Sequence, residues 1–275
     1  MNNKKLAAVL AVIALVFGTA ACTSANSKDV NVLKVASVPT PHNEILDYLQ
    51  ESGQIGDLKI EQVNVSSGET ANQGTREGSV DANYFQHLPY LKDWQKQVGD
   101  NSLVSVADVH VEPLALYSTK IHNKNDIPDG AQIALPQSDT NFARGLLLLE
   151  KEGVIKLDAK PEDLSQIHET DIIDNPKHLV FKRVDDILAP KALDDKNVTG
   201  AIISGSYAMG AGLSIANNGV VAESAKDNPY ANVFVTTNKK KDDPRIKKVA
   251  DALTSKQTAD WIKAKYGDSV VPVHG

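Results

Sequence analysis

Residues 131–153 read AQIALPQSDTNFARGLLLLEKEG, and this stretch predicts one strand followed by one helix. Residues 131–135 form a short apolar run that is typical of a buried strand. The Ser-Asp-Thr sequence at 138–140 offers helix N-cap side chains, and Gly153 is a typical stop for a helix over 142–152. A strand that leads directly into a helix is the repeating unit of α/β proteins.

The same alternation of strand and helix signals runs through the rest of the chain. We expect a helix over 43–50, and the apolar residues of 246–253 recur at i, i+3, i+4 and i+7, which predicts another. Residues 254–257 (TSKQ) have the form of a capping box that opens a further helix. The expected strands are 33–38, 58–65, 103–106, 112–118, 178–181, 198–203 and 231–236.

The order of these elements predicts an α/β protein of two lobes. The alternation begins, passes through a middle block and returns late, as it does when two lobes share crossover segments. We expect lobe 1 to comprise 32–115 plus 226–275, and lobe 2 to comprise 116–225. A ligand would then lie in the cleft between the lobes, at strand ends and helix N-termini.

The N-terminus has the features of an export signal. A short basic head precedes the unbroken apolar run 6–16, which is too short for a membrane-spanning helix. Small residues then lead to Cys22, as in a bacterial lipobox, although position 19 is Thr where Leu is most common. We therefore expect a lipoprotein signal peptide at 1–21, lipidation of Cys22 and a flexible tether at 22–31; the alternative is an ordinary signal peptide with an incidental cysteine.

Composition excludes several classes of protein. The chain has 275 residues, 41% of them hydrophobic, which is enough for a sizeable core. A formal charge of −6 argues against a surface for nucleic acid, which needs a concentrated basic face. Cys22 is the single cysteine, so neither an intrachain disulfide framework nor a Cys-rich zinc site is possible.

Aromatic residues gather in the segment 81–90, DANYFQHLPY, although they make up only 5% of the chain. Phe85 and Tyr90 would supply the apolar wall of a pocket, and His87 would orient polar groups in it. The alternative is a core cluster in which His87 bonds to the backbone.

Arg144 lies in the first turns of the helix expected over 142–152. The free N–H groups at a helix N-terminus attract anions, and a guanidinium binds a carboxylate through two parallel bonds. These features favour an anion beside Arg144, with a solvent-facing arginine as the alternative.

Other chemistries have little support. Neither Ser204 nor Ser206 lies in a nucleophile elbow, and the glycines near them lack the end of a phosphate loop. His110 and Glu112 share one face of a strand, and His42 or His87 could complete a metal site, but no ligand spacing enforces one. We expect no metal, no cofactor and no catalysis.

Read in order, these segments resemble the NlpA/MetQ family of lipoproteins, the methionine-binding components of bacterial ABC importers. The resemblance runs from about residue 33 to residue 273. Its markers are 40–46 (TPHNEIL), 81–90, 110–113 (HVEP), 116–118 (Leu-Tyr-Ser), 140–150 (TNFARGLLLLE), 227–233 (DNPYANV) and 270–273 (VVPV).

The resemblance implies a type II periplasmic-binding-protein fold that closes on its ligand and docks on a permease and its ATPase. It implies that ligand-contacting residues line the cleft. Phe85, His87 and Tyr90 would surround the ligand side chain, Arg144 would hold the carboxylate with Asn141 beside it, and Asn232 would bind the amino-acid head. The protein would act outside the cytoplasm, held to the membrane by lipid on Cys22.

Two positions depart from the family pattern. Ser204 stands where the family usually has an Asn, which keeps a hydrogen bond but loses reach. Gly68 lies in the segment where the family usually has an aromatic residue, which removes one ring from the pocket wall. The expected ligand is therefore methionine, a related amino acid or a short peptide. The alternatives are a metal-capture or adhesin-like lipoprotein, or an exported enzyme.

Overall fold

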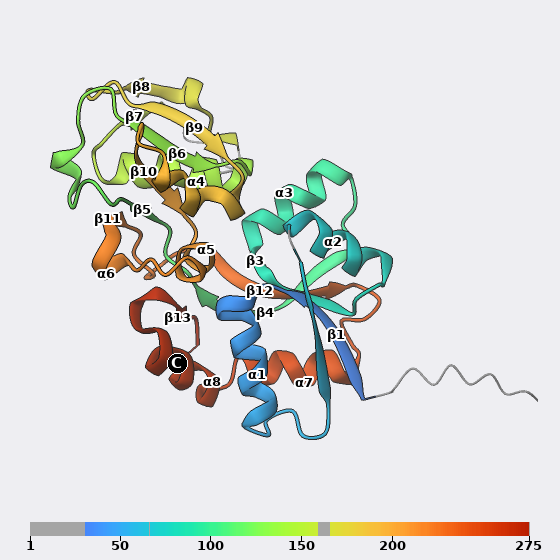
Figure 1. Cartoon of the computed structure of the whole chain (residues 1–275). Coiled ribbons are helices and arrows are strands. Elements are labelled where there is room, and N and C mark those ends of the chain that lie inside the picture. The colour runs from blue at the N-terminus through green and yellow to red at the C-terminus, as the bar shows by residue number, and fades with distance from the viewer. Residues whose placement is uncertain (1–30, 66, 159–165, 275) are drawn as a thin grey trace, which may run out of the picture. The chain divides into compact units, whose positions relative to one another are not determined.

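The computed structural model describes residues 31–65, 67–158 and 166–274 (Figure 1). The expected signal peptide and the lipidation site Cys22 lie outside these residues. Within the described ranges, no helix has the length and apolar character needed to cross a membrane.

The first sheet has six strands and is built from both ends of the described chain. β1 pairs in parallel with β2 and β3, whereas β12 lies antiparallel between β3 and β4. In sheet order the strands are β13 (Val271–Pro272), β4 (Leu103–Val111), β12 (Ala231–Thr237), β3 (Ala82–His87), β1 (Val32–Ser37) and β2 (Lys59–Asn64).

The second sheet has five strands and is built from the middle of the chain. β6 is parallel to β9 and β10, and β5 is antiparallel to β10 and β11. In sheet order the strands are β11 (Gly219–Ala222), β5 (Ala115–Tyr117), β10 (Val198–Ile203), β6 (Gln132–Pro136) and β9 (Val180–Val184); a separate pair joins β7 (Lys156–Leu157) and β8 (Ile172–Asp174).

Helices pack against both sheets (Figure 1). They are α1 (Glu44–Glu51), α2 (Gly68–Glu77), α3 (Leu88–Val98), α4 (Asp139–Lys151), α5 (Gly205–Gly210), α6 (Ile215–Asn218), α7 (Pro244–Leu253) and α8 (Lys256–Tyr266). The remaining helical segments are η1 (Pro39–Asn43), η2 (Lys124–Asp126), η4 (Glu169–Asp171), η5 (Asp186–Asp194) and η6 (Gly267–Ser269).

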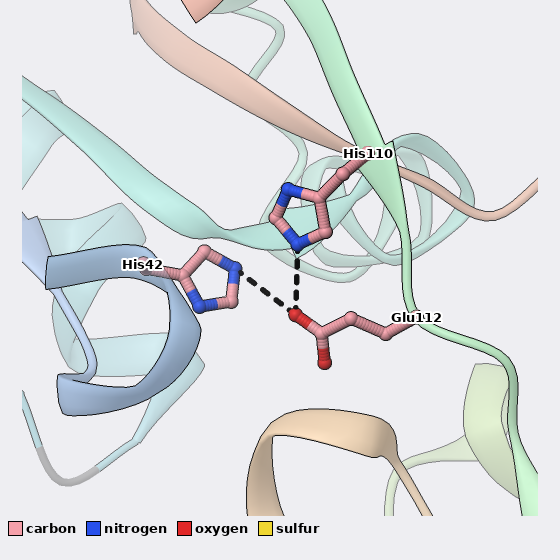
Figure 2. A group of neighbouring side chains, drawn as sticks. All are labelled: His42, His110 and Glu112. Carbon is pink, nitrogen blue, oxygen red and sulfur yellow. Dashed lines mark hydrogen bonds and ion pairs between the residues drawn. The ribbon is translucent and has the colours of Figure 1, made fainter. Parts of the chain in front are cut away.

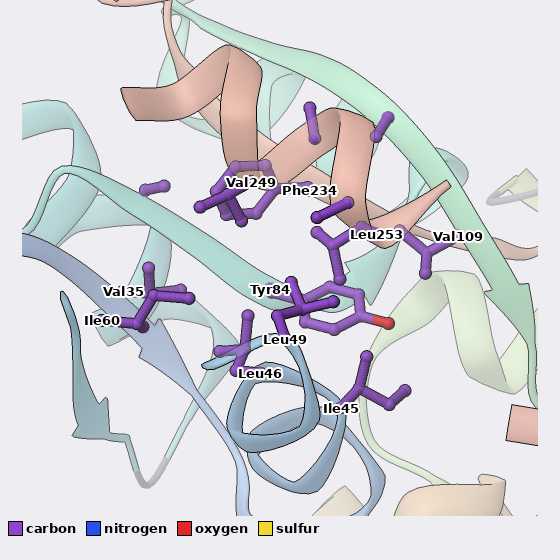
Figure 3. Close-up of a cluster of buried hydrophobic side chains, with 14 of the residues drawn as sticks. Val35, Ile45, Leu46, Leu49, Ile60, Tyr84, Val109, Phe234, Val249 and Leu253 are labelled. Atoms are coloured by element: carbon purple, nitrogen blue, oxygen red, sulfur yellow. The ribbon is translucent and has the colours of Figure 1, made fainter. Parts of the chain in front are cut away.

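Each sheet has its own apolar core. In the first core, Leu46 and Leu49 of α1 and Leu253 of α7 pack with Val35 of β1 and Phe234 of β12 (Figure 3). These side chains are at most 2% exposed, and burying each contributes about 1.5–3 kcal/mol. The second sheet contributes to two apolar clusters, one that includes α4 and one that includes η5 and α5. The helical spacing of apolar residues in α1, α4 and α7 is therefore what attaches these helices to the sheets.

The structure adjusts several predicted boundaries. The strand expected over 103–106 continues to Val111, and the chain then passes to the second sheet over 112–114 before β5 begins. α4 begins three residues earlier than predicted, directly after Ser138. The cap of α8 is Ser255, whose hydroxyl accepts a hydrogen bond from the Thr258 N–H at 3.1 Å, so the predicted box is shifted by one residue.

Hydrophobic spacing did not predict α2, because this helix packs through polar side chains. Asn72 of α2 exchanges two amide hydrogen bonds with Gln86 of β3, at 2.9 and 2.6 Å. Asn83 of β3 donates to Asn72 and to Thr75. All four side chains are buried. A network of this kind satisfies its polar groups internally and leaves no apolar pattern in the sequence.

Candidate functional site

A cavity of about 310 Å³ lies where elements of the two sheets meet. Its walls come from α2, β3 and β12 on one side and from α4, η5 and α5 on the other. All seven side chains that the sequence suggested for ligand contact line this cavity: Phe85, His87, Tyr90, Asn141, Arg144, Ser204 and Asn232.

Two aromatic rings form one wall of the cavity. Phe85 lies on β3 and Tyr90 in the first turn of α3, and their ring centroids are 6.1 Å apart in an edge-to-face arrangement. A Cβ atom on Gly68 would lie 2.6 Å from Phe85 Cε2 and 2.6 Å from Tyr90 Oη. Both rings therefore occupy space that a side chain at position 68 would need. The glycine at this position is what allows the wall to close with two rings.

His87 is the N-cap of α3 and has a defined tautomer. Its Nδ1 accepts a hydrogen bond from the Tyr90 N–H at 3.1 Å, so the proton lies on Nε2, which donates to Asn141 Oδ1 at 2.9 Å. Burial and the positive charge of Arg144 lower the pKa of His87 to about 3. His87 is therefore a neutral side chain that fixes the orientation of the Asn141 amide.

Arg144 lies three residues after Asn141, on the same face of α4. Its Nε and Nη2 donate to the Glu223 carboxylate at 2.8 and 2.5 Å, and Nη2 also donates to the Glu112 carbonyl at 2.9 Å. The guanidinium stacks 4.2 Å above the centroid of the Tyr230 ring. The hydrogen bonds of Arg144 to other described residues use Nε and Nη2 and do not use Nη1. The anion beside Arg144 in this structure is thus the Glu223 carboxylate of the protein itself.

Ser204 and Asn232 complete the polar lining. Ser204 is the N-cap of α5, but its hydroxyl makes no capping hydrogen bond. Asn232 lies on β12, where its Oδ1 accepts a hydrogen bond from His42 Nε2 at 3.1 Å. The amide of Asn232 is therefore held in place by a buried imidazole.

The cavity also contains acidic residues that the sequence reasoning did not place there. Glu69, Asp185 and Asp186 join Glu112 in the lining, against one arginine. Asp186 accepts hydrogen bonds from the Ser138 hydroxyl at 2.7 Å and from the Asn141 amide at 2.9 Å. Only Glu112 had a signal in the sequence, its alternation with His110 on one strand. Nothing local marked the acids of η5 or Glu223.

His42, His110 and Glu112 form a buried cluster (Figure 2), which meets the cavity at Glu112. His110 Nε2 donates to Glu112 Oε1 at 2.9 Å, and His42 Nε2 lies 3.5 Å from the same oxygen. The Tyr84 hydroxyl and His110 Nδ1 share a hydrogen bond of 2.6 Å. The three donor atoms lie within 4.8 Å of one another, so they could hold a divalent ion as well as bond to each other. His87 bonds to Asn141 instead and is not in this cluster.

Known proteins are similar to this chain in both sequence and fold. Residues 33–274 match the model of the NlpA lipoprotein family. The chain is 37% identical to the methionine-binding lipoprotein MetQ of Bacillus subtilis over 99% of both chains. A nutrient-binding protein from Burkholderia cenocepacia bound to methionine superposes with a TM-score of 0.82 at 33% identity, covering 88% of this chain and 99% of that one. An ABC-transporter periplasmic substrate-binding protein from Coxiella burnetii superposes with a TM-score of 0.80 at 34% identity, covering 88% and 100%.

Proposed function

Since the chain belongs to the NlpA lipoprotein family, we propose that it is the extracytoplasmic substrate-binding lipoprotein of an ABC importer. Its ligand would be methionine or a related amino acid or short peptide, as the relatives that bind methionine suggest. The observation that supports this most is the cavity between the two sheets, where an aromatic wall faces an arginine and several amides. Such a site suits a small zwitterion with an apolar side chain.

In this proposal each wall of the cavity has one task. Phe85 and Tyr90 contact the apolar side chain of the ligand, and Arg144 Nη1 donates to its carboxylate. Asn141, oriented by His87, stands beside that carboxylate. Ser204 and Asn232 bind the amino-acid head, so the whole arrangement captures the ligand without breaking a bond in it.

The remaining parts of the proposal concern the whole chain. Lobe 1 would comprise 32–115 plus 226–275 and lobe 2 would comprise 116–225, and they would close on the ligand. Cys22 would carry the lipid that anchors the protein to the membrane. The closed protein would then deliver its ligand to a permease driven by an ATPase.

A thermal-shift panel of amino acids, dipeptides and divalent metals tests the function. A ligand that binds only the folded state stabilises it by about 2.7 kcal/mol at 100 times its Kd. We expect an amino acid or short peptide to raise the melting temperature, and a response to metals alone would favour metal capture through the His42 cluster instead. Arg144→Lys keeps the charge but loses the planar fork, and should abolish the shift. Arg245→Lys, in α7 and outside the cavity lining, is the matched control and should leave it unchanged.

A further inference from the structure

Glu112 lies at the crossing between the two sheets and faces the cavity. Its side chain is 5% exposed, and it lines the cavity together with Arg144 and Asn232. Oε1 accepts the hydrogen bond from His110, and Oε2 accepts one from the Ser206 N–H at 2.6 Å. The carboxylate is therefore held from both sides, by β4 and by the start of α5.

The groups that hold Glu112 do not neutralise it. The groups within reach of the carboxylate are the imidazoles of His110 and His42 and the Ser206 N–H. Of the described residues that bond to the carboxylate, none is a lysine or an arginine. Glu112 is thus a buried carboxylate without a lysine or arginine partner, an arrangement that is costly unless a cation joins it.

The charges around the head of the cavity do not balance. Among the described residues that line the cavity, Arg144 is the one cation, and Glu223 already pairs with it. Glu112 is then a second anion, next to a guanidinium that also donates to its backbone carbonyl at 2.9 Å. A ligand carboxylate on Arg144 Nη1 would place the adjacent α-carbon substituent near Glu112. A positively charged substituent would supply the charge that this end of the cavity lacks.

We propose that Glu112 is the charged partner of the α-ammonium group of the ligand, an inference that rests on the proposed capture of an amino acid. The buried imidazoles of His42 and His110 then act as positioning residues that aim the carboxylate into the cavity. The ligand class follows from this role. A free α-amino acid carries its ammonium beside its carboxylate, whereas in an N-acylated amino acid or at the C-terminal residue of a dipeptide that nitrogen is an uncharged amide.

A thermodynamic cycle tests the contact directly. Calorimetry compares methionine with its deamino analogue, which keeps the carboxylate and the side chain, in the wild type and in Glu112→Gln. The variant removes the charge but not the shape. Losing one partner of a buried charge pair should weaken methionine by about 30-fold or more, while the deamino analogue changes by less than about threefold. Glu61→Gln, the same substitution on an exposed side chain of β2 outside the cavity lining, should leave both affinities within about threefold of the wild type.

The outcomes separate this inference from the proposed function. Equal weakening of both ligands in Glu112→Gln would make the residue merely structural and overturn the inference, while the capture of methionine would stand. The inference is also overturned if the wild type binds the deamino analogue or N-acetylmethionine as tightly as methionine, a comparison that needs no variant. A wild type that binds no amino acid would overturn both. Should Glu112→Gln not fold, Glu112→Asp keeps the charge but withdraws it by one methylene, and should weaken methionine selectively.

Discussion

At the buried pair of Arg144 and Glu223, a single substitution should cost this protein a large part of its stability. The two side chains are 3% and 11% exposed. Glu223 accepts two bonds from the guanidinium, one from the Leu114 N–H at 3.1 Å and one from the Asn228 amide at 3.0 Å. Glu223→Ala leaves the guanidinium buried without its anion. Removing one partner of such a pair costs about 3–5 kcal/mol of the free energy of unfolding.

Urea unfolding followed by circular dichroism measures this cost in the ligand-free protein. The double variant Arg144→Met with Glu223→Leu replaces both charges by apolar groups, so it should recover most of the lost stability. Asp260→Ala provides the control, because the pair of Lys256 and Asp260 is 78% and 63% exposed. Breaking this exposed pair should change the free energy of unfolding by less than about 0.5 kcal/mol.

The reasoning fails if Glu223→Ala loses less than about 1 kcal/mol, which is the range of an exposed pair. That result would mean that water reaches the guanidinium and solvates it. A double variant as unstable as the single one would also contradict it, since the loss would then come from packing or from the Leu114 N–H rather than from an unpaired charge.

Three further substitutions test other parts of the structure. Gly68→Ala should weaken ligand binding in calorimetry, because the added methyl group must displace the ends of the Phe85 and Tyr90 rings. The free energy of unfolding should change by less than about 1 kcal/mol, because those ring ends can move. The free energy of unfolding should fall as the pH drops from about 6.5 towards 3, because His87 takes up a proton at a higher pH in the unfolded chain than in the folded protein. His87→Gln should make urea unfolding less sensitive to pH over this range. An unaltered pH profile in this variant would contradict the buried neutral imidazole. Cys22→Ser should abolish lipidation. If intact-mass spectrometry shows that the wild type carries no lipid, the lipobox interpretation is wrong.

Local patterns predicted several of the elements that pack through apolar side chains, but not β3 or α3. The helices expected over 43–50, 142–152 and 246–253 all exist, within three residues at their starts. The polar helix α2 escaped prediction because Asn72 and its partners bury amide groups, which no hydrophobic spacing reveals. Apolar periodicity indicates which face of a segment packs against the hydrophobic core, and it gives no information on a segment that packs through side-chain hydrogen bonds.

What the sequence by itself determined is the α/β alternation and the kinds of side chain that line the cavity. Those features depend on neighbours along the chain, so the order of residues contains them. Tertiary structure alone decided which charges meet: Arg144 and Glu223 are 79 positions apart, and His42 and Asn232 are 190 apart. Whether a carboxylate pairs with an arginine or is available to a ligand depends on the distance between the two charged groups and on their burial. Neither quantity can be read from the local sequence.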